Sequence, residues 1–215
     1  MYIPPSNAEH DVATILAYME ARPLGALVTS SARGGLIATH LPLLVHRERG
    51  AHGVLEGHLA RANPQSRQIE NGAEALVIFS GHDAYITPEW YAAKREHGRV
   101  VPTWNYIAVH AYGTLRLIDD PHALHRHLEA LTLRHESPRP APWSVSDAPE
   151  DFVAQQMRAI VGVEIEITRL EGNWKMSQSR SHADIDGVVQ GLRDSAAPEE
   201  RAVAEIVAAR RPAES

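Results

Sequence analysis

Two short segments hold the side chains best suited to binding a polar ligand, Val101–Tyr106 and Asn173–Arg180. Each combines an indole with amides and hydroxyls, and the second adds a lysine and an arginine. Buried amides and charges cost free energy unless they are paired, so this mixture is not typical of a core strand. It suits a site for a flat, anionic ligand with a polar edge.

The choice of cation supports the same interpretation. The chain has 21 basic side chains, of which only Lys94 and Lys175 are lysines. Lysine presents a compact ammonium where arginine presents a planar fork, so a lysine in a chain that otherwise uses arginine is a candidate for a specific contact. Chance placement of two lysines remains the alternative.

Three further polar groups are weaker candidates. Their residues are Thr39, His40 and Leu41 within an apolar strand; His58, Arg61 and Asn63 around a helix start; and Ser80, which opens a glycine-containing loop. A helix start offers free N–H groups and a positive dipole end, which suit a phosphate. Each group also has an ordinary structural explanation: an edge strand for the first, a capped helix for the second and a plain β-turn for the third.

No metal or catalytic signature emerges. His122, His125 and His127 lie on one predicted helix, but a metal site needs three or four converging ligands, so we interpret them as a polar helix face and expect no metal. The absence of cysteine excludes disulfides and thiolate chemistry. The sequence favours a ligand site over a reaction, and leaves open whether the protein is an enzyme.

Composition indicates a globular protein. The 215 residues are 44% hydrophobic and 22% charged, with a net charge of −6, which argues against a surface that binds nucleic acid throughout. No signal peptide and no membrane segment are apparent, so we expect a cytoplasmic protein. We expect residues 1–215 to form one domain, with a helical insertion at about 121–160 and C-terminal helices at about 183–210.

Periodicity predicts a mainly β chain with helices. Helices are predicted at 7–20, 89–96, 121–136, about 150–160, about 183–193 and 198–210. Strands are predicted at 24–30, 36–46, about 52–59, 75–79, 100–118 and 161–170, with a further short strand at 85–86. Short hairpins with helices between and after them indicate an α+β fold, an antiparallel barrel of six strands with helical additions.

Several motifs together resemble the PaiB-type, FMN-binding negative transcriptional regulators of the flavin-binding split-barrel class. The motifs are Met1–Pro5, Gly57–Pro64, Ala84–Tyr91, Val101–Tyr106 with Val109 and His110, Lys175–Gln178 and Asp186–Leu192. Each motif alone is weak, and the combination is specific. One departure is Ser179, where the family usually has asparagine.

The resemblance implies a six-stranded split β-barrel that dimerises, with FMN in a groove at the dimer interface. FMN is then the expected cofactor and a homodimer the expected assembly. We expect Arg61, Lys175 and the helix start at Asn63 to bind the phosphate, Trp104 to stack on the isoalloxazine, and Asn105, Gln178 and Thr39 to bond its polar edge.

Three functions follow as hypotheses: a flavoprotein acting as a repressor in transcription regulation, a flavin-dependent oxidoreductase acting on a small molecule, and a plain cofactor carrier. Fold alone does not choose among them. The one helix pair resembling a DNA-binding motif, within residues 181–211, carries four arginines against six acidic residues. Direct DNA binding is therefore doubtful, and regulation through a partner or a metabolite is the expectation.

Overall fold

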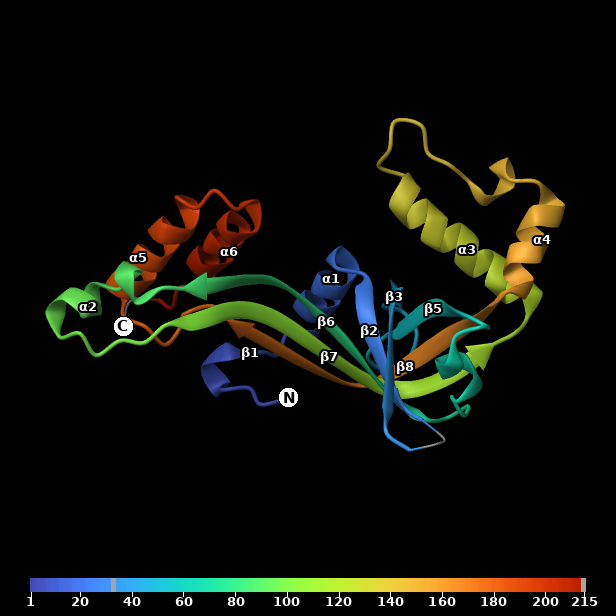
Figure 1. Cartoon of the computed structure of the whole chain (residues 1–215), viewed down its shortest axis with the longest axis horizontal. Coiled ribbons are helices and arrows are strands. Elements are labelled where there is room, and N and C mark those ends of the chain that lie inside the picture. The colour runs from blue at the N-terminus through green and yellow to red at the C-terminus, as the bar shows by residue number, and fades with distance from the viewer. Residues whose placement is uncertain (32–33, 214–215) are drawn as a thin grey trace. The chain divides into compact units, whose positions relative to one another are not determined.

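The computed structural model describes residues 1–31 and 34–213 (Figure 1). Their strands form one antiparallel sheet with the order β3-β2-β6-β7-β8-β5-β4, and the short strand β1 pairs with β8. Six strands have seven residues or more: β2 (Leu24–Ser30), β3 (Leu36–Pro42), β5 (Val54–Ala60), β6 (Glu74–Ile86), β7 (Thr103–Ile118) and β8 (Ile160–Lys175). The short strands are β1 (Ala8–Glu9) and β4 (Leu44–His46).

The expectation of an α+β antiparallel fold with six principal strands is confirmed. In the part of the chain that the structure describes, however, the sheet is an open path from β3 to β4 rather than a closed ring. Because β3 is at the end of that path, Pro42 lies on an edge strand, where its missing N–H costs no ladder hydrogen bond.

The chain divides into two compact units, and the division falls within β6, β7 and β8. The first unit comprises residues 1–11, 80–109 and 171–215, and the second comprises 12–79 and 110–170. We call them the terminal unit and the central unit. Among the described residues, every helix is too short or too polar to span a lipid bilayer.

The central unit contains β2 to β5, parts of the long strands, and five helical segments. These are α1 (Val12–Ala21), the 3-10 helix η2 (Pro64–Arg67), and the insertion of α3 (Pro121–Glu136), η4 (Val145–Asp147) and α4 (Glu150–Arg158). The side chains of Met19, Leu27, Leu55, Val77 and Ile165 are fully buried and form its core. β5 pairs with β8 in a register that places Gly57 opposite Val163. Because side chains alternate along a strand, Leu55 and Leu59 lie on the same face of β5 as Gly57, and this face is buried.

The terminal unit carries the 3-10 helices η1 (Pro5–Asn7) and η3 (Pro88–Trp90), and the helices α2 (Ala92–Glu96), α5 (His182–Arg193) and α6 (Pro198–Ala209). Figure 1 shows α5 and α6 side by side. Gly187 lets α5 approach η3 closely, because a Cβ built at this glycine would lie 1.9 Å from the backbone oxygen of Trp90.

Three element predictions are wrong. The strand predicted at 36–46 is two strands, β3 and β4, which Leu43 separates. The helix predicted at 7–20 starts at Val12, because Glu9 accepts a hydrogen bond from the Asp11 N–H and forms an ion pair with Arg210. The strands predicted at 75–79 and 85–86 are one strand, β6. The expected turn between them is a distortion within that strand, where Gly81 and His82 have φ values of 147° and 50°.

Candidate functional site

The terminal unit contains a pocket of about 360 Å³ built from η1, the start of β7, the end of β8 and the turn that follows it. Its lining residues are Pro4, Ser6, Asn7, Thr103, Asn105, Lys175, Ser177, Gln178, Ser179 and Arg180. None of these described residues is acidic. Two of them are basic, and seven of the others carry hydroxyls or amides. Both segments singled out in the sequence therefore contribute to one pocket.

The turn after β8 is fixed by its own side chains. Ser177 has φ of 64°, a left-handed conformation that is uncommon outside glycine. Its hydroxyl and the fully buried Asn105 amide exchange hydrogen bonds of 3.0 and 3.2 Å. Gln178 accepts from the Met176 N–H at 2.6 Å and donates to the Trp174 carbonyl. These amides thus hold the backbone that presents the two cations.

Lys175 and Arg180 give the pocket its positive charge. The Lys175 ammonium donates to the Thr103 hydroxyl at 2.6 Å, and the Arg180 guanidinium lies 4.6 Å from the centroid of the Tyr91 ring. Burial, and secondarily the charge of Arg180, lower the pKa of Lys175 below its usual 10.5. Among the described residues neither cation forms an ion pair with a carboxylate, so the pocket is suited to an anion.

The other candidates of the terminal unit lie elsewhere on it. Trp104 is 53% exposed, and it points to the opposite face of β7 from Thr103 and Asn105 because side chains alternate along a strand. It forms an edge-to-face pair with Tyr85, with ring centroids 5.9 Å apart. Ser80 is exposed at the middle of β6. Neither residue lines the pocket that contains Lys175.

In the central unit, two candidates form a pair. The Asn63 side-chain amide donates to Thr39 Oγ1 at 2.8 Å, and Asn63 Oδ1 caps η2 by accepting from the Gln65 N–H. Gln65 is fully buried, and its Oε1 has no hydrogen-bond partner within the described chain. On β3, His40 is exposed whereas Leu41 is buried in the core.

The remaining two candidates already have partners in the protein. His58 Nδ1 lies 3.0 Å from Nε2 of the buried His127, whose Nδ1 lies 2.9 Å from the Glu56 carboxylate. Burial, and secondarily His127, lower the pKa of His58. Arg61 pairs with the Asp119 carboxylate and donates to the Arg158 carbonyl at 3.1 Å. Sequence inspection did not foresee Asp119 as a partner for Arg61.

Seven pocket residues were missed among the candidates. Four of them lie in the two segments on which the site prediction rests, Thr103, Ser177, Ser179 and Arg180, so the segments were a correct signal. The other three, Pro4, Ser6 and Asn7, lie at η1, outside both segments. The alternation along β7 and the left-handed turn at Ser177 decide which side chains of the two segments face the pocket.

Comparison with known proteins gives a family. A family model described as "Putative FMN-binding domain" matches residues 1–169. The protease synthase and sporulation protein PAI 2 of Bacillus subtilis is 32% identical over 207 residues, which cover 96% of each chain. The uncharacterized protein AN0679 of Emericella nidulans is 34% identical over 241 residues, again with 96% of each chain covered. These findings confirm the family resemblance inferred from the sequence.

Solved structures give the fold. The FAD and heme binding protein from Mycobacterium smegmatis is similar with a TM-score of 0.60 and 16% identity, over 84% of this chain and 79% of that one. The conserved hypothetical protein Rv2991 from Mycobacterium tuberculosis is similar with a TM-score of 0.57 and 15% identity, over 85% and 95% of the two chains. These similarities confirm the expected split-barrel fold.

Proposed function

The chain belongs to this FMN-binding domain family, and from that membership we propose that its terminal unit binds the 5′-phosphate of FMN between Lys175 and Arg180. The observation that carries the proposal is a pocket with two cations, many hydroxyls and amides, and no carboxylate. A phosphate accepts charge-assisted hydrogen bonds from donors of this kind, and such bonds are about twice as strong as neutral ones.

The residues fit the group in specific roles. The Lys175 ammonium and the Arg180 guanidinium bind the phosphate oxygens, and the Thr103 hydroxyl holds the ammonium in place. An incoming dianion offsets the burial and the repulsion that lower the Lys175 pKa. Bound FMN supplies an isoalloxazine that accepts and returns electrons. The two bonded pairs, Asn105 with Ser177 and Thr39 with Asn63, fix polar groups within their own units.

We further propose that the flavoprotein is a negative regulator of transcription that acts through a partner or a metabolite. The relative from Bacillus subtilis is named for protease synthase and sporulation, which supports a regulatory role over a purely metabolic one. Indirect action is favoured because the arginines of α5 and of the chain end are engaged within the protein: Arg193 pairs with Glu205, and Arg211 with Asp186.

The proposed assembly is a homodimer in which the second copy helps to enclose the flavin. The terminal unit exposes Val101, Trp104 and Tyr85 at 64%, 53% and 45%. Exposed apolar side chains gathered on one surface usually mark an interface, and aromatic residues are enriched there. Trp104 then contacts the partner copy rather than the Lys175 pocket of its own chain.

The test compares FMN with riboflavin, which lacks the phosphate. We expect flavin fluorescence to be quenched on titration with FMN, Lys175→Ala to weaken FMN binding about tenfold or more, and Lys175→Arg to weaken it less. Riboflavin affinity should change little in either variant. An equal loss of affinity for FMN and riboflavin would mean that Lys175 stabilises the fold or contacts the isoalloxazine ring instead of the phosphate. Absence of fluorescence quenching at about tens of micromolar FMN would contradict cofactor binding.

Two further measurements test the assembly and the regulatory role. Light scattering should report a species of about twice 23.7 kDa, and a single 23.7 kDa species would contradict the dimer. Addition of NADH or NADPH should leave the oxidised flavin spectrum unchanged on the minute timescale. Rapid bleaching that reverses in air would instead support the oxidoreductase hypothesis.

A further inference from the structure

We propose that the helical insertion of the central unit is a second ligand site, which binds an amphipathic monocarboxylate with an apolar body. The site is a pocket of about 630 Å³ between α3, η4 and α4. This volume falls in the range of about 300–1,000 Å³ that is typical of small-molecule sites. The inference does not depend on the proposed flavin function, because none of the pocket's residues lines the Lys175 pocket.

The walls of the pocket are apolar. They consist of Pro121 and Leu124 from α3, Val145 and Ala148 from η4 and the residue after it, and Val153, Ala154 and Met157 from α4. Met157 is the only sulfur-containing side chain among these lining residues. None of the residues of α4 is buried, although Val153 and Met157 recur at helical spacing on one face. That face is available to a ligand because the chain itself leaves it open.

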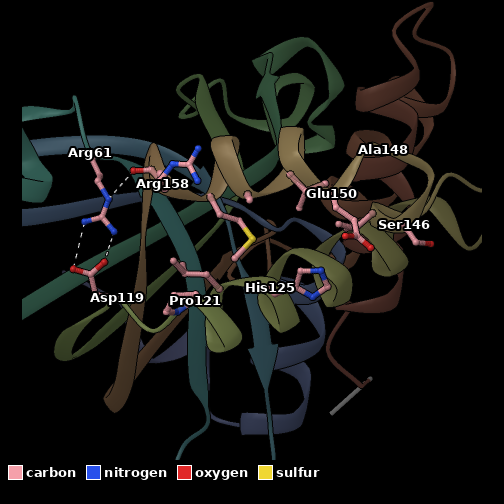
Figure 2. Close-up of a pocket in the computed structure, with 13 residues that line it drawn as sticks. Arg61, Asp119, Pro121, His125, Ser146, Ala148, Glu150 and Arg158 are labelled. Carbon is pink, nitrogen blue, oxygen red and sulfur yellow. Dashed lines mark hydrogen bonds and ion pairs between the residues drawn. The ribbon is translucent and has the colours of Figure 1, made fainter.

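The two ends of the pocket differ in charge. Arg61, Asp119 and Arg158 lie at one end, and His125, Ser146 and Glu150 lie at the other (Figure 2). At the first end the Arg61–Asp119 ion pair is neutral overall, which leaves the charge of Arg158. Within the described residues the guanidinium of Arg158 has no ionic partner, since only its backbone carbonyl is engaged, by Arg61. This end therefore carries a net charge of about +1.

The distance between the ends sets the length of the ligand. Glu150 and Arg158 are eight residues apart on one helix, which corresponds to about 12 Å at 1.5 Å per residue. A ligand with its carboxylate at Arg158 and an apolar body of about eight carbons fills the apolar middle without reaching the Glu150 carboxylate. A phosphate ester is less suitable, because a dianion meets only one unpaired cation. An amine is repelled at this end and would bind only in the reverse direction, with its ammonium at Glu150.

The test is isothermal titration with octanoate, octanol and octylamine. We expect octanoate to bind one molecule per chain with a Kd on the order of 0.1–1 mM, and both octanol and octylamine to bind less tightly. Arg158→Gln should weaken octanoate binding about tenfold and leave octanol binding unchanged. Val153→Trp fills the pocket and should abolish the binding of all three probes.

Gln155→Trp is the matched control, because Gln155 lies on the same helix and does not line the pocket. It should retain wild-type octanoate affinity, and thermal unfolding should show that all three variants are folded. Equal affinity for octanoate and octanol, or an Arg158→Gln effect on both, would overturn the assignment of the carboxylate. Absence of binding by any probe, with a change in oligomeric state for Val153→Trp, would identify the pocket as a protein interface and overturn the proposal.

Discussion

Lys175 lies at the end of β8, where its ammonium is partly buried and close to a second cation. Both conditions disfavour the charged form, so the pKa of Lys175 is lower than that of an exposed lysine. A bound phosphate favours the charged form again. Ligand affinity and protonation at this residue are therefore coupled, and the coupling is measurable as a pH dependence.

We expect the affinity for FMN to fall as the pH rises through the lowered pKa of Lys175, below the usual 10.5. The sign follows because the neutral amine no longer attracts the phosphate. Riboflavin is the control, because it shares the ionisation of the ring but lacks the phosphate. The ratio of FMN affinity to riboflavin affinity therefore isolates the contribution of the contact between Lys175 and the phosphate. Lys175→Arg should make the ratio independent of pH between about pH 8 and 10, because arginine stays protonated throughout this range. A ratio independent of pH in the wild type would contradict the phosphate contact.

At the scale of elements, the contact between α5 and η3 depends on the absence of a side chain at Gly187. Alanine normally stabilises a helix interior by about 1 kcal/mol relative to glycine. Here its Cβ would lie 1.9 Å from the Trp90 backbone oxygen, and a backbone atom cannot move aside as a flexible side chain does. The steric cost of overpacking, about 1–3 kcal/mol or more, exceeds the gain in propensity.

We therefore expect Gly187→Ala to lower the free energy of unfolding by about 1–3 kcal/mol in urea denaturation. Ala183→Ser, at an exposed position in the first turn of α5, is the control and should change it by less than about 0.5 kcal/mol. A stabilising Gly187→Ala would mean that α5 and η3 do not pack as closely as described.

A second contact between elements joins α3 to the sheet of the central unit. Glu56 on β5 lies 2.9 Å from His127 on α3 and 2.7 Å from His46 on β4, and Arg49 lies 3.6 Å away. The contacts with His127 and His46 hold the pKa of Glu56 far below its usual 4.5. Burial lowers the pKa of His58 below its usual 6.5. In both cases the unfolded chain binds its proton at a higher pH than the folded chain.

The free energy of unfolding should thus be greatest above about pH 6.5 and decline as the pH falls through the lowered pKa of His58. It should decline further below about pH 4.5, where Glu56 binds a proton in the unfolded chain before it does so in the folded chain. Glu56→Gln should cost on the order of 3 kcal/mol at neutral pH and make the decline below pH 4.5 shallower. Glu129→Gln, which breaks only the exposed 3.3 Å pair with His125, should be nearly neutral. Unfolding free energies measured from about pH 7 to about pH 3 test the order of the two declines. An unchanged slope in Glu56→Gln would contradict this account.

Elements specified by local signals could be predicted from the sequence, and those specified by distant partners could not. α3 begins and ends as predicted, at 121 and 136, because Asp120 caps it and Pro121 occupies its first turn. The start of α1 was wrong because Glu9 is held by Arg210, which lies 201 residues away in the sequence. The same limit applies to the site: the segments were recognisable by composition, whereas the Arg61–Asp119 pair depends on a contact over 58 residues.

At the scale of the whole molecule, charge limits the partners. The net charge is −6, and the arginines of the C-terminal helices are engaged within the terminal unit. Arg193 pairs with Glu205, Arg210 with Glu9 and Arg211 with Asp186. Arg201 donates to the carbonyls of Ser195 and Ala196. Neutralising DNA phosphates requires these cations to leave their partners, which reduces the gain from counterion release.

We expect random duplex DNA to bind with a Kd at or beyond about 10⁻⁴ M at physiological salt, with a shallow salt dependence. Fluorescence anisotropy with labelled duplex measures both quantities. The FMN-loaded protein should behave in the same way as the apoprotein. Sub-micromolar binding with a steep salt slope would restore direct repression as the mechanism.

The scarcity of lysine gives the chain an unusual chemical reactivity. Its only amines are Lys94, Lys175 and the N-terminus, and Lys94 pairs with Glu89 while the N-terminus pairs with Glu171. A lysine with a lowered pKa is more often in its nucleophilic form near neutral pH, so a limiting amount of an acylating reagent should modify Lys175 in preference to Lys94. Mass spectrometry of the labelled peptides would then report occupancy of the pocket directly, since FMN, but not riboflavin, should protect Lys175.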